Sequence, residues 1–224
     1  MDAAALNGNT ALHAASYNNH PRVARALLDA GAPLEAADAN RPTPAYFAAK
    51  QGSLAALRVL LARGAALDAQ TADAGFSALM CAAARGDAPV VRALLAAGAA
   101  VNLRSSQHQD SALQLAVSTA ASAPAPRARI AAALLRAGAD ADSQQAQGWS
   151  ALHVAADRKD LLLAAVLLRF GADSALLNND GDTARDVVAG AEVGGPVLEL
   201  LEFEDDGEGE EEEEEDEEDE DEDA

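Results

Sequence analysis

Aromatic residues and cysteine are scarce in this sequence. Of its 224 residues only 3% are Phe, Trp or Tyr, whereas half are apolar and alanine is abundant. We therefore expect a core of small and aliphatic side chains brought close together. The single cysteine, Cys81, excludes an intramolecular disulfide and favours a reducing compartment. On this basis we expect cytoplasmic and/or nuclear localisation.

The sequence also lacks long apolar runs and a visible leader. Its first ten residues, MDAAALNGNT, contain no basic segment followed by an apolar run, so we expect no signal peptide. The longest strongly apolar run, LLLAAVLL from Leu161 to Leu168, is too short to span a bilayer. We therefore expect no membrane partner.

Lysine and arginine are absent from Glu202 to Asp223, where 19 residues are acidic. The formal net charge is −21, yet the other 18 acidic residues nearly balance the 16 basic ones. Like charges at this density repel, so we predict that residues 202–224 form a disordered acidic tail. Two interpretations stay open: a solubilising appendage, or a segment that attracts a basic protein. A polyanion repels DNA and RNA, so no direct nucleic-acid partner is expected.

A repeat dominates the rest of the chain. The phrases GNTALHAA, GFSALMCAAA and GWSALHVAA are each followed by a Leu-Leu pair and then Gly-Ala. A hydroxyl residue recurs at spacings of 33, 34, 34, 39 and 33 residues, at Thr10, Thr43, Ser77, Ser111, Ser150 and Thr183. A glycine lies 21 residues after each of the first five, or 27 after Ser111, at Gly31, Gly64, Gly98, Gly138 and Gly171. The fourth unit therefore carries a six-residue insertion.

Each unit predicts a helix, a turn, a second helix and a loop. The Thr or Ser oxygen can accept from first-turn amides as an N-cap, and glycine suits the left-handed C-terminal cap. Neither helix can bury its apolar face alone, so neighbouring units must cover it. The insertion near Ser122–Ile130 carries two prolines, which we expect to exclude regular helix there. A tolerated surface loop is the favoured interpretation, and a family-specific contact is the alternative.

This pattern resembles the ankyrin repeat family, whose core phrase is T-P-L-H-x-A-A with a later L-L-x-x-G-A. The resemblance covers residues 7–201 and implies an all-α solenoid of stacked helix-turn-helix units with projecting finger loops. We expect repeats at about 7–39, 40–73, 74–107, 108–146 and 147–179, with a degenerate C-terminal cap at 180–201. Proteins of this family bind other proteins through the finger tips and the inner helices, which form a concave face.

No motif predicts catalysis, a metal site or a cofactor. His13 and His153 hold the family's structural position, where the imidazole bonds within and between repeats. One cysteine cannot supply the usual zinc site, and Cys81 follows Met80 on a core helix, where we expect a buried and inert thiol. No phosphate-binding glycine loop occurs. We therefore expect no enzyme, no cofactor and no small-molecule substrate.

The candidate protein-binding residues fall into two groups. The finger segments 36–41, 69–76, 103–110, 143–149 and 176–182 contain Arg41, Phe76, Arg104, His108 and Trp149. For the two aromatic residues, packing at the finger base is favoured over binding. The second group ends the first helices: Lys50, Arg85, Arg158 and Lys159. A structural role for these cations is to complement helix dipoles.

We therefore hypothesise a monomeric, non-enzymatic adaptor, escort or scaffold whose concave face binds a protein and whose tail favours a basic partner. One alternative is a regulatory module that its own tail autoinhibits. Arg25, Arg58 and Arg92 each lie 15 residues after a hydroxyl residue, so they should form a row along the second helices. A solvated face is the simpler interpretation of this row, and an acidic ligand or the tail is the other. A further alternative is the ankyrin part of a larger multidomain protein.

Overall fold

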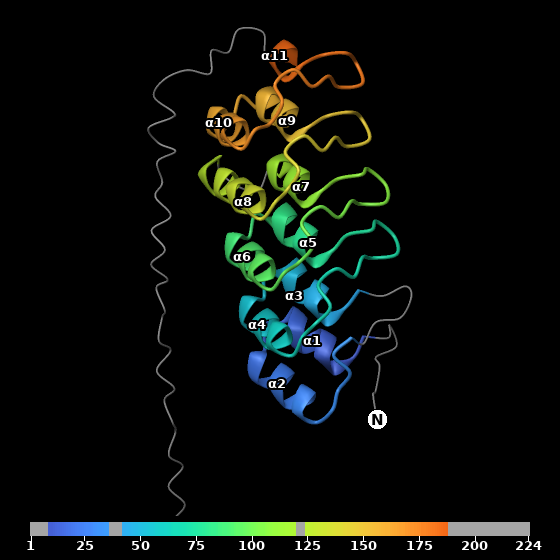
Figure 1. Cartoon of the computed structure of the whole chain (residues 1–224). Helices are drawn as coiled ribbons and strands as arrows, with labels where there is room; N and C mark the ends of the chain where they lie inside the picture. The colour runs from blue at the N-terminus through green and yellow to red at the C-terminus, as the bar shows by residue number, and fades with distance from the viewer. Residues whose placement is uncertain (1–8, 36–41, 120–123, 188–224) are drawn as a thin grey trace, which may run out of the picture.

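Paired helices stack into an elongated solenoid with fingers on one side (Figure 1). The structure is a computed structural model that describes residues 9–35, 42–119 and 124–187. The first helix of each pair is the inner helix, next to the fingers: α1 (Ala11–Tyr17), α3 (Pro44–Gln51), α5 (Ala78–Arg85), α7 (Ala112–Ser118) and α9 (Ala151–Asp157). The second is the outer helix: α2 (Pro21–Asp29), α4 (Leu54–Ala62), α6 (Ala88–Ala96), α8 (Pro124–Arg136) and α10 (Leu161–Arg169). A short helix, α11 (Ala184–Val187), follows the last finger.

Hydroxyl residues cap the inner helices, as predicted. The side chains of Thr10, Thr43, Ser77, Ser111 and Ser150 each accept from the backbone amide three residues later. The outer helices end at glycines in the left-handed region, with φ from 78° to 88°, at Gly31, Gly64, Gly98, Gly138 and Gly171. The recurring Thr, Ser and Gly therefore set both ends of the repeated unit.

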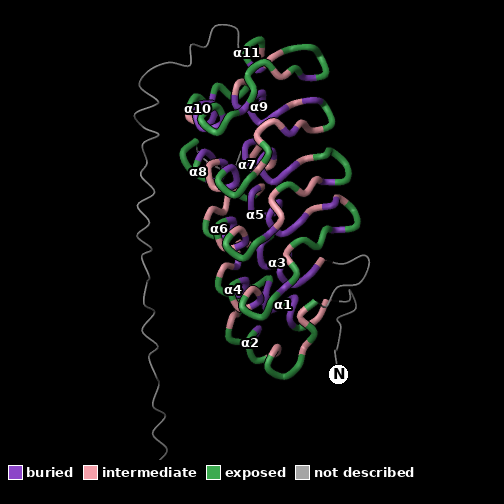
Figure 2. The backbone as a smooth tube through the Cα atoms, viewed as in Figure 1, coloured by how far each residue is buried: buried purple, intermediate pink, exposed green. Residues whose placement is uncertain are grey.

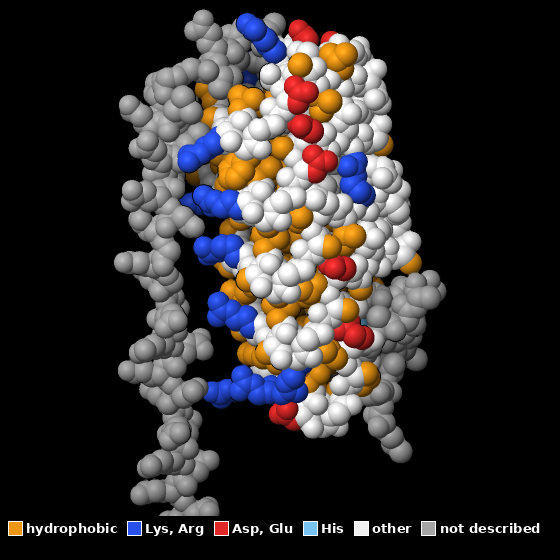
Figure 3. All heavy atoms as spheres, in the orientation of Figure 1, with side chains coloured by type: hydrophobic (Ala, Val, Ile, Leu, Met, Phe, Trp, Pro, Cys, Tyr) orange, Lys and Arg blue, Asp and Glu red, His pale blue; other side chains and the backbone are white. Residues whose placement is uncertain are grey.

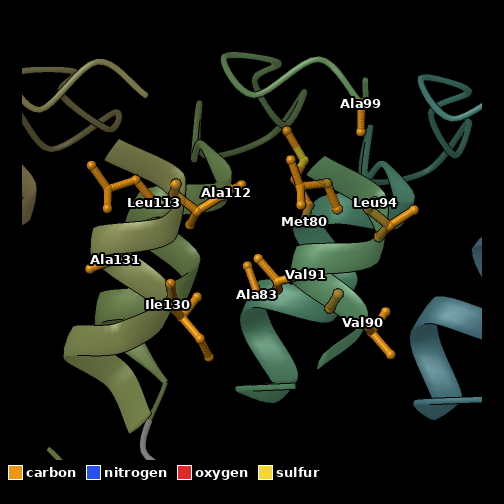
Figure 4. Packing of buried hydrophobic residues seen from close by; sticks show 14 of the residues in the cluster. Met80, Ala83, Val90, Val91, Leu94, Ala99, Ala112, Leu113, Ile130 and Ala131 are labelled. Carbon is orange, nitrogen blue, oxygen red and sulfur yellow. The ribbon is translucent and has the colours of Figure 1, made fainter. Parts of the chain in front are cut away.

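The core is a continuous layer of alanine and branched aliphatic residues between neighbouring repeats (Figure 2). Ala48, Ala82 and Ala116 on successive inner helices are completely buried. In Figure 4, Met80 and Val91 of α5 and α6 lie on the side toward Leu113 and Ile130 of the next pair, while Leu94 lies on the opposite side of α6. Small side chains allow the inner helices to approach closely, and each repeat buries its apolar faces against its neighbours.

The expectation that the two prolines of the insertion exclude helix was wrong. Helix α8 begins at Pro124 and runs for 13 residues, whereas α6 has nine. Pro124 and Pro126 both lie in its first turn, where backbone amides have no intrahelical acceptor, so the missing donors cost nothing. Part of the insertion therefore extends an outer helix, while residues 120–123 and the tail lie outside the described residues.

A buried ion pair joins the lengthened helix α8 to α10. Nη1 of Arg127 lies 2.6 Å from Oδ2 of Asp160, and the two side chains are only 8% and 4% exposed. Oδ1 of Asp160 also accepts from the Leu163 amide at 3.1 Å, which makes Asp160 the N-cap of α10. Nη2 of Arg127 donates to the Thr119 carbonyl at 3.1 Å. These two side chains therefore connect the end of α7 with α8 and α10.

We predict that Asp160→Ala lowers the free energy of unfolding by about 3 kcal/mol, because it strands a buried guanidinium and removes a helix cap. Urea denaturation measures the loss. Asp29→Ala is the matched control, since Asp29 forms a 2.6 Å pair with Arg63 on the surface. Such exposed pairs contribute less than about 1 kcal/mol. Equal losses in the two variants would contradict the proposed importance of burial.

Candidate protein-binding surface

The described fingers are hairpin-like turns between an outer helix and the next inner helix (Figure 1). Backbone hydrogen bonds close them: the Thr71 amide donates to the Phe76 carbonyl at 3.0 Å, and the Ser105 amide to the Asp110 carbonyl at 2.9 Å. The later fingers are closed in the same way, from Gln145 to Trp149 at 3.0 Å and from Asn178 to Asp182 at 2.9 Å. Each finger is therefore locally ordered by its own backbone.

Side chains tie consecutive fingers together. Nε2 of Gln70 donates to the Arg104 carbonyl at 2.9 Å in the next finger. The Arg104 guanidinium donates in turn to the Gln144 carbonyl, and Nε2 of Gln144 donates to the Leu177 carbonyl at 2.6 Å. These residues occupy equivalent positions in successive repeats. We call this series of hydrogen bonds the finger ladder.

The candidate residues of the fingers have different surroundings. Phe76 and Trp149 are half-buried and pack against the core, which agrees with the favoured structural interpretation. Arg104 is half-buried and belongs to the finger ladder. The side chain of His108 is exposed, and its carbonyl accepts from the Ala146 amide at 2.9 Å. Arg41 lies outside the described residues.

The candidate residues at the helix ends are all exposed. Lys50 lies in the last turn of α3, and Arg85 is the last residue of α5. Helix α9 ends at Asp157, so Arg158 is its C-cap and Lys159 follows with a φ of 53°. The Arg158 guanidinium donates to the Ser118 carbonyl at the end of α7. We call the surface formed by these helix ends and the fingers the inner face.

Aromatic side chains gather at the N-terminal part of the inner face, on α1 and α3. The centroid of the Phe47 ring lies 5.5 Å from that of His13, 6.3 Å from Tyr17 and 5.9 Å from Tyr46. Tyr17 is 45% exposed, so its ring is accessible on this face. The sequence interpretation missed this cluster. The available signal was that three of only seven aromatic residues fall between positions 17 and 47.

A pocket of about 460 Å³ opens beside this cluster. It is bounded by α3 and by the finger that follows α4, and its lining residues are Pro42, Tyr46, Phe47, Lys50, Thr71, Ala72 and Asp73. Nζ of Lys50 lies 5.9 Å from the centroid of the Tyr46 ring. The pocket thus has aromatic walls with a cation and a carboxylate at its edge.

The groups of the pocket have defined charge states near neutral pH. Hydrogen bonds from Thr71 and from the Ala74 amide, the latter at 2.7 Å, hold the pKa of Asp73 below its ordinary value. Burial raises the pKa of the Cys81 thiol, although its hydrogen bond with Tyr46 and the charge of Lys50 oppose this. Burial and Cys81 also raise the pKa of Tyr46. The pocket therefore presents a neutral Tyr46 and a charged Asp73, while the Cys81 thiol is buried and does not line the pocket, which suits binding better than nucleophilic chemistry.

We predict that the free energy of unfolding falls as pH rises above about 9. The unfolded thiol loses its proton near an ordinary pKa of 9.0, whereas burial keeps the folded thiol protonated to higher pH. The folded state then binds more protons than the unfolded state, so stability is full below this range and declines above it. Urea denaturation between pH 7 and pH 10 measures the decline. Cys81→Ala should make it shallower, and an unchanged slope would contradict the assignment.

Among the described residues, no group of three or more His, Cys, Asp or Glu side chains is placed to hold a metal ion. Within the same residues, no helix combines the length and apolar character that a membrane crossing needs.

Comparison with known proteins agrees with this architecture. A family model of three ankyrin repeats matches residues 1–71, and a single-repeat ankyrin model matches residues 74–106 and 147–179. The chain is similar to the crystal structure of the ankyrin repeat domain of Bcl-3, a unique member of the IkappaB protein family, at 33% identity with a TM-score of 0.70. That match covers 86% of this chain and 82% of the Bcl-3 chain, while the comparison with curated proteins gave no match. The resemblance and the all-α solenoid are confirmed: the chain belongs to the ankyrin repeat family and forms a module of the kind that binds other proteins.

Proposed function

We propose that this chain is a non-enzymatic adaptor that binds a protein partner through its inner face, with the aromatic pocket as the anchor point. The observation that carries the proposal is the exposed Tyr17 beside the pocket of Tyr46, Phe47 and Lys50. Aromatic anchors in pockets are typical of the residues that dominate binding energy at protein interfaces. The finger ladder supports this role, because it holds the neighbouring loops in one arrangement before a partner arrives.

The chemistry of the pocket suggests what a partner presents to it. Phe47 and Tyr46 offer an apolar surface for one large apolar side chain. Asp73 is exposed and its lowered pKa keeps it charged, so it favours a basic residue next to that side chain. Lys50, which also lines the pocket, favours a carbonyl or carboxylate. A few fixed polar groups around an apolar pocket give a bound segment a defined orientation.

The composition of the tail supports the choice of a basic partner. Its 19 acidic residues raise the local concentration of positively charged proteins and speed their encounter. We propose that the adaptor or escort works as a monomer in the cytoplasm or the nucleus and that the tail shields part of a basic client. The similarity to the ankyrin domain of Bcl-3 supports a protein as the partner.

Tyr17→Ser should weaken partner binding roughly 30-fold, which corresponds to about 2 kcal/mol for an aromatic anchor. Affinity capture with the full chain, followed by mass spectrometry, provides the partner, and calorimetry measures the affinity. Val23→Ser is the matched control, because Val23 is 50% exposed on outer helix α2. If both variants bind as tightly as the parent chain, the inner face is not the binding surface.

Removal of residues 202–224 should reduce the affinity for the captured partner and flatten its dependence on salt. Charge attraction at the surface is screened at high ionic strength, so the difference between the full and shortened chains should shrink as salt increases. Calorimetry at several salt concentrations measures both effects. Equal affinity at low salt would exclude a basic partner of the tail.

A further inference from the structure

Arginine side chains cover the outer helices on the side away from the fingers. In Figure 3, Lys and Arg side chains gather in a column over this part of the molecule. Four of the five outer helices contribute, and we define the arginine face by four exposed residues: Arg25, Arg58, Arg92 and Arg136. This charged surface has no part in the pocket or the finger ladder.

Three of these residues repeat in register. Arg25, Arg58 and Arg92 are each the fifth residue of their outer helix, as the sequence spacing predicted. Packed helices lie about 8–10 Å apart, which is close to the Debye length at physiological ionic strength. Neighbouring arginines of the row therefore repel one another, and a negative ligand that spans several of them would relieve this repulsion.

The nearby carboxylates are engaged elsewhere. Asp29 pairs with Arg63 at 2.6 Å. In the turns after the outer helices, three carboxylates each accept a hydrogen bond from a backbone amide of the next repeat. The oxygen-to-nitrogen distances are 2.6 Å for Glu35, 2.8 Å for Asp68 and 2.7 Å for Asp142. Figure 3 shows acidic side chains in a separate column, set toward the fingers. The arginine face therefore keeps an excess of positive charge.

We propose that the acidic tail of the same chain, residues 202–223, binds the arginine face. The two are complementary in charge, since the tail has 19 acidic residues and no basic ones. The 22 residues from Glu202 to Asp223 span up to about 70 Å when extended. Five outer helices packed at about 10 Å occupy roughly 40 Å, so the tail is long enough to reach each of them.

The covalent attachment of the tail to the repeats determines how strong this contact is and how fast it exchanges. Each exposed ion pair is weak, but a tethered segment has a high effective concentration next to its own surface. Many weak pairs in parallel produce a contact that salt reverses and that exchanges quickly. A basic protein then competes with the arginines for the tail, and an acidic ligand competes with the tail for the arginines. The contact between the tail and the arginine face requires no partner protein, so it can be tested independently of the proposed adaptor function.

Paramagnetic relaxation in the full chain tests the contact. A nitroxide label on Gly209→Cys, in a Cys81→Ala background, keeps every charge of the tail. At low salt we expect the label to broaden backbone amide signals of α4 and α6 and to leave the finger signals sharp. The broadening should disappear in 1 M NaCl, where the Debye length is about 3 Å.

Two variants of equal charge distinguish a specific surface from general attraction. The triple variant Arg25→Gln, Arg58→Gln, Arg92→Gln should abolish the broadening on the outer helices. The matched variant Lys50→Gln, Arg85→Gln, Lys159→Gln on the inner face should retain it. Equal loss in both variants, or equal broadening of fingers and outer helices, would overturn the proposal. A mixture of an isotope-labelled chain without the nitroxide and an unlabelled chain that carries it tests for contact between molecules. Broadening of the outer-helix signals in this mixture would also overturn the proposal, because the tail would then bind a second copy.

Discussion

In three of the five paired inner helices, one polar contact fixes the helix start to the chain segment before the next inner helix, and the inner face depends on this contact. In α1 and α9, Nδ1 of the histidine at the third helical position bonds to the N-cap, while Nε2 reaches the next finger. His13 contacts the Pro42 carbonyl and His153 the Asp182 carbonyl, both at 3.1 Å. Gln114 does the same through Nε2, which donates to the Ser143 carbonyl at 2.7 Å. The start of a helix and the loop of the following repeat are thereby held at a set distance.

The pocket lies at one of the two inner helices in which this bridging residue is replaced, by Tyr46 in α3 and by Met80 in α5. The second repeat has Tyr46 at the third helical position, and its ring lines the pocket beside Phe47 and Lys50. Its hydroxyl bonds to Cys81 of the next inner helix. Because the repeats on either side remain covered by their own neighbours, a local change of this kind alters the surface without loss of the stack. The longer helix α8 is a second case of local variation.

Residues whose role recurs every 33 or 34 positions could be predicted from the sequence, and those whose contact occurs in only one repeat could not. The caps at Thr10 and Ser150, the bridging histidines and the C-terminal glycines all act within one unit or on the next in phase. The ion pair of Arg127 and Asp160 depends on how the lengthened helix α8 lies against α10. The spacing of residues in the sequence does not contain this information. The aromatic pocket requires Phe47 on an inner helix to meet Asp73 in the finger that follows the same helix pair. The prolines of α8 were misread because their effect depends on where a helix begins.

The finger ladder makes the loops a single mechanical unit. Gln70, Arg104 and Gln144 connect each finger to its successor, so displacement of one tip is resisted by the next. Loops that are ordered together before binding lose little conformational entropy when a partner contacts several of them. Such a surface discriminates by fit rather than by adapting its shape, and a change in one rung would be felt at neighbouring tips. The rigidity that the finger ladder gives to the whole set of fingers, more than the chemistry of any single finger, would then determine the selectivity of the inner face.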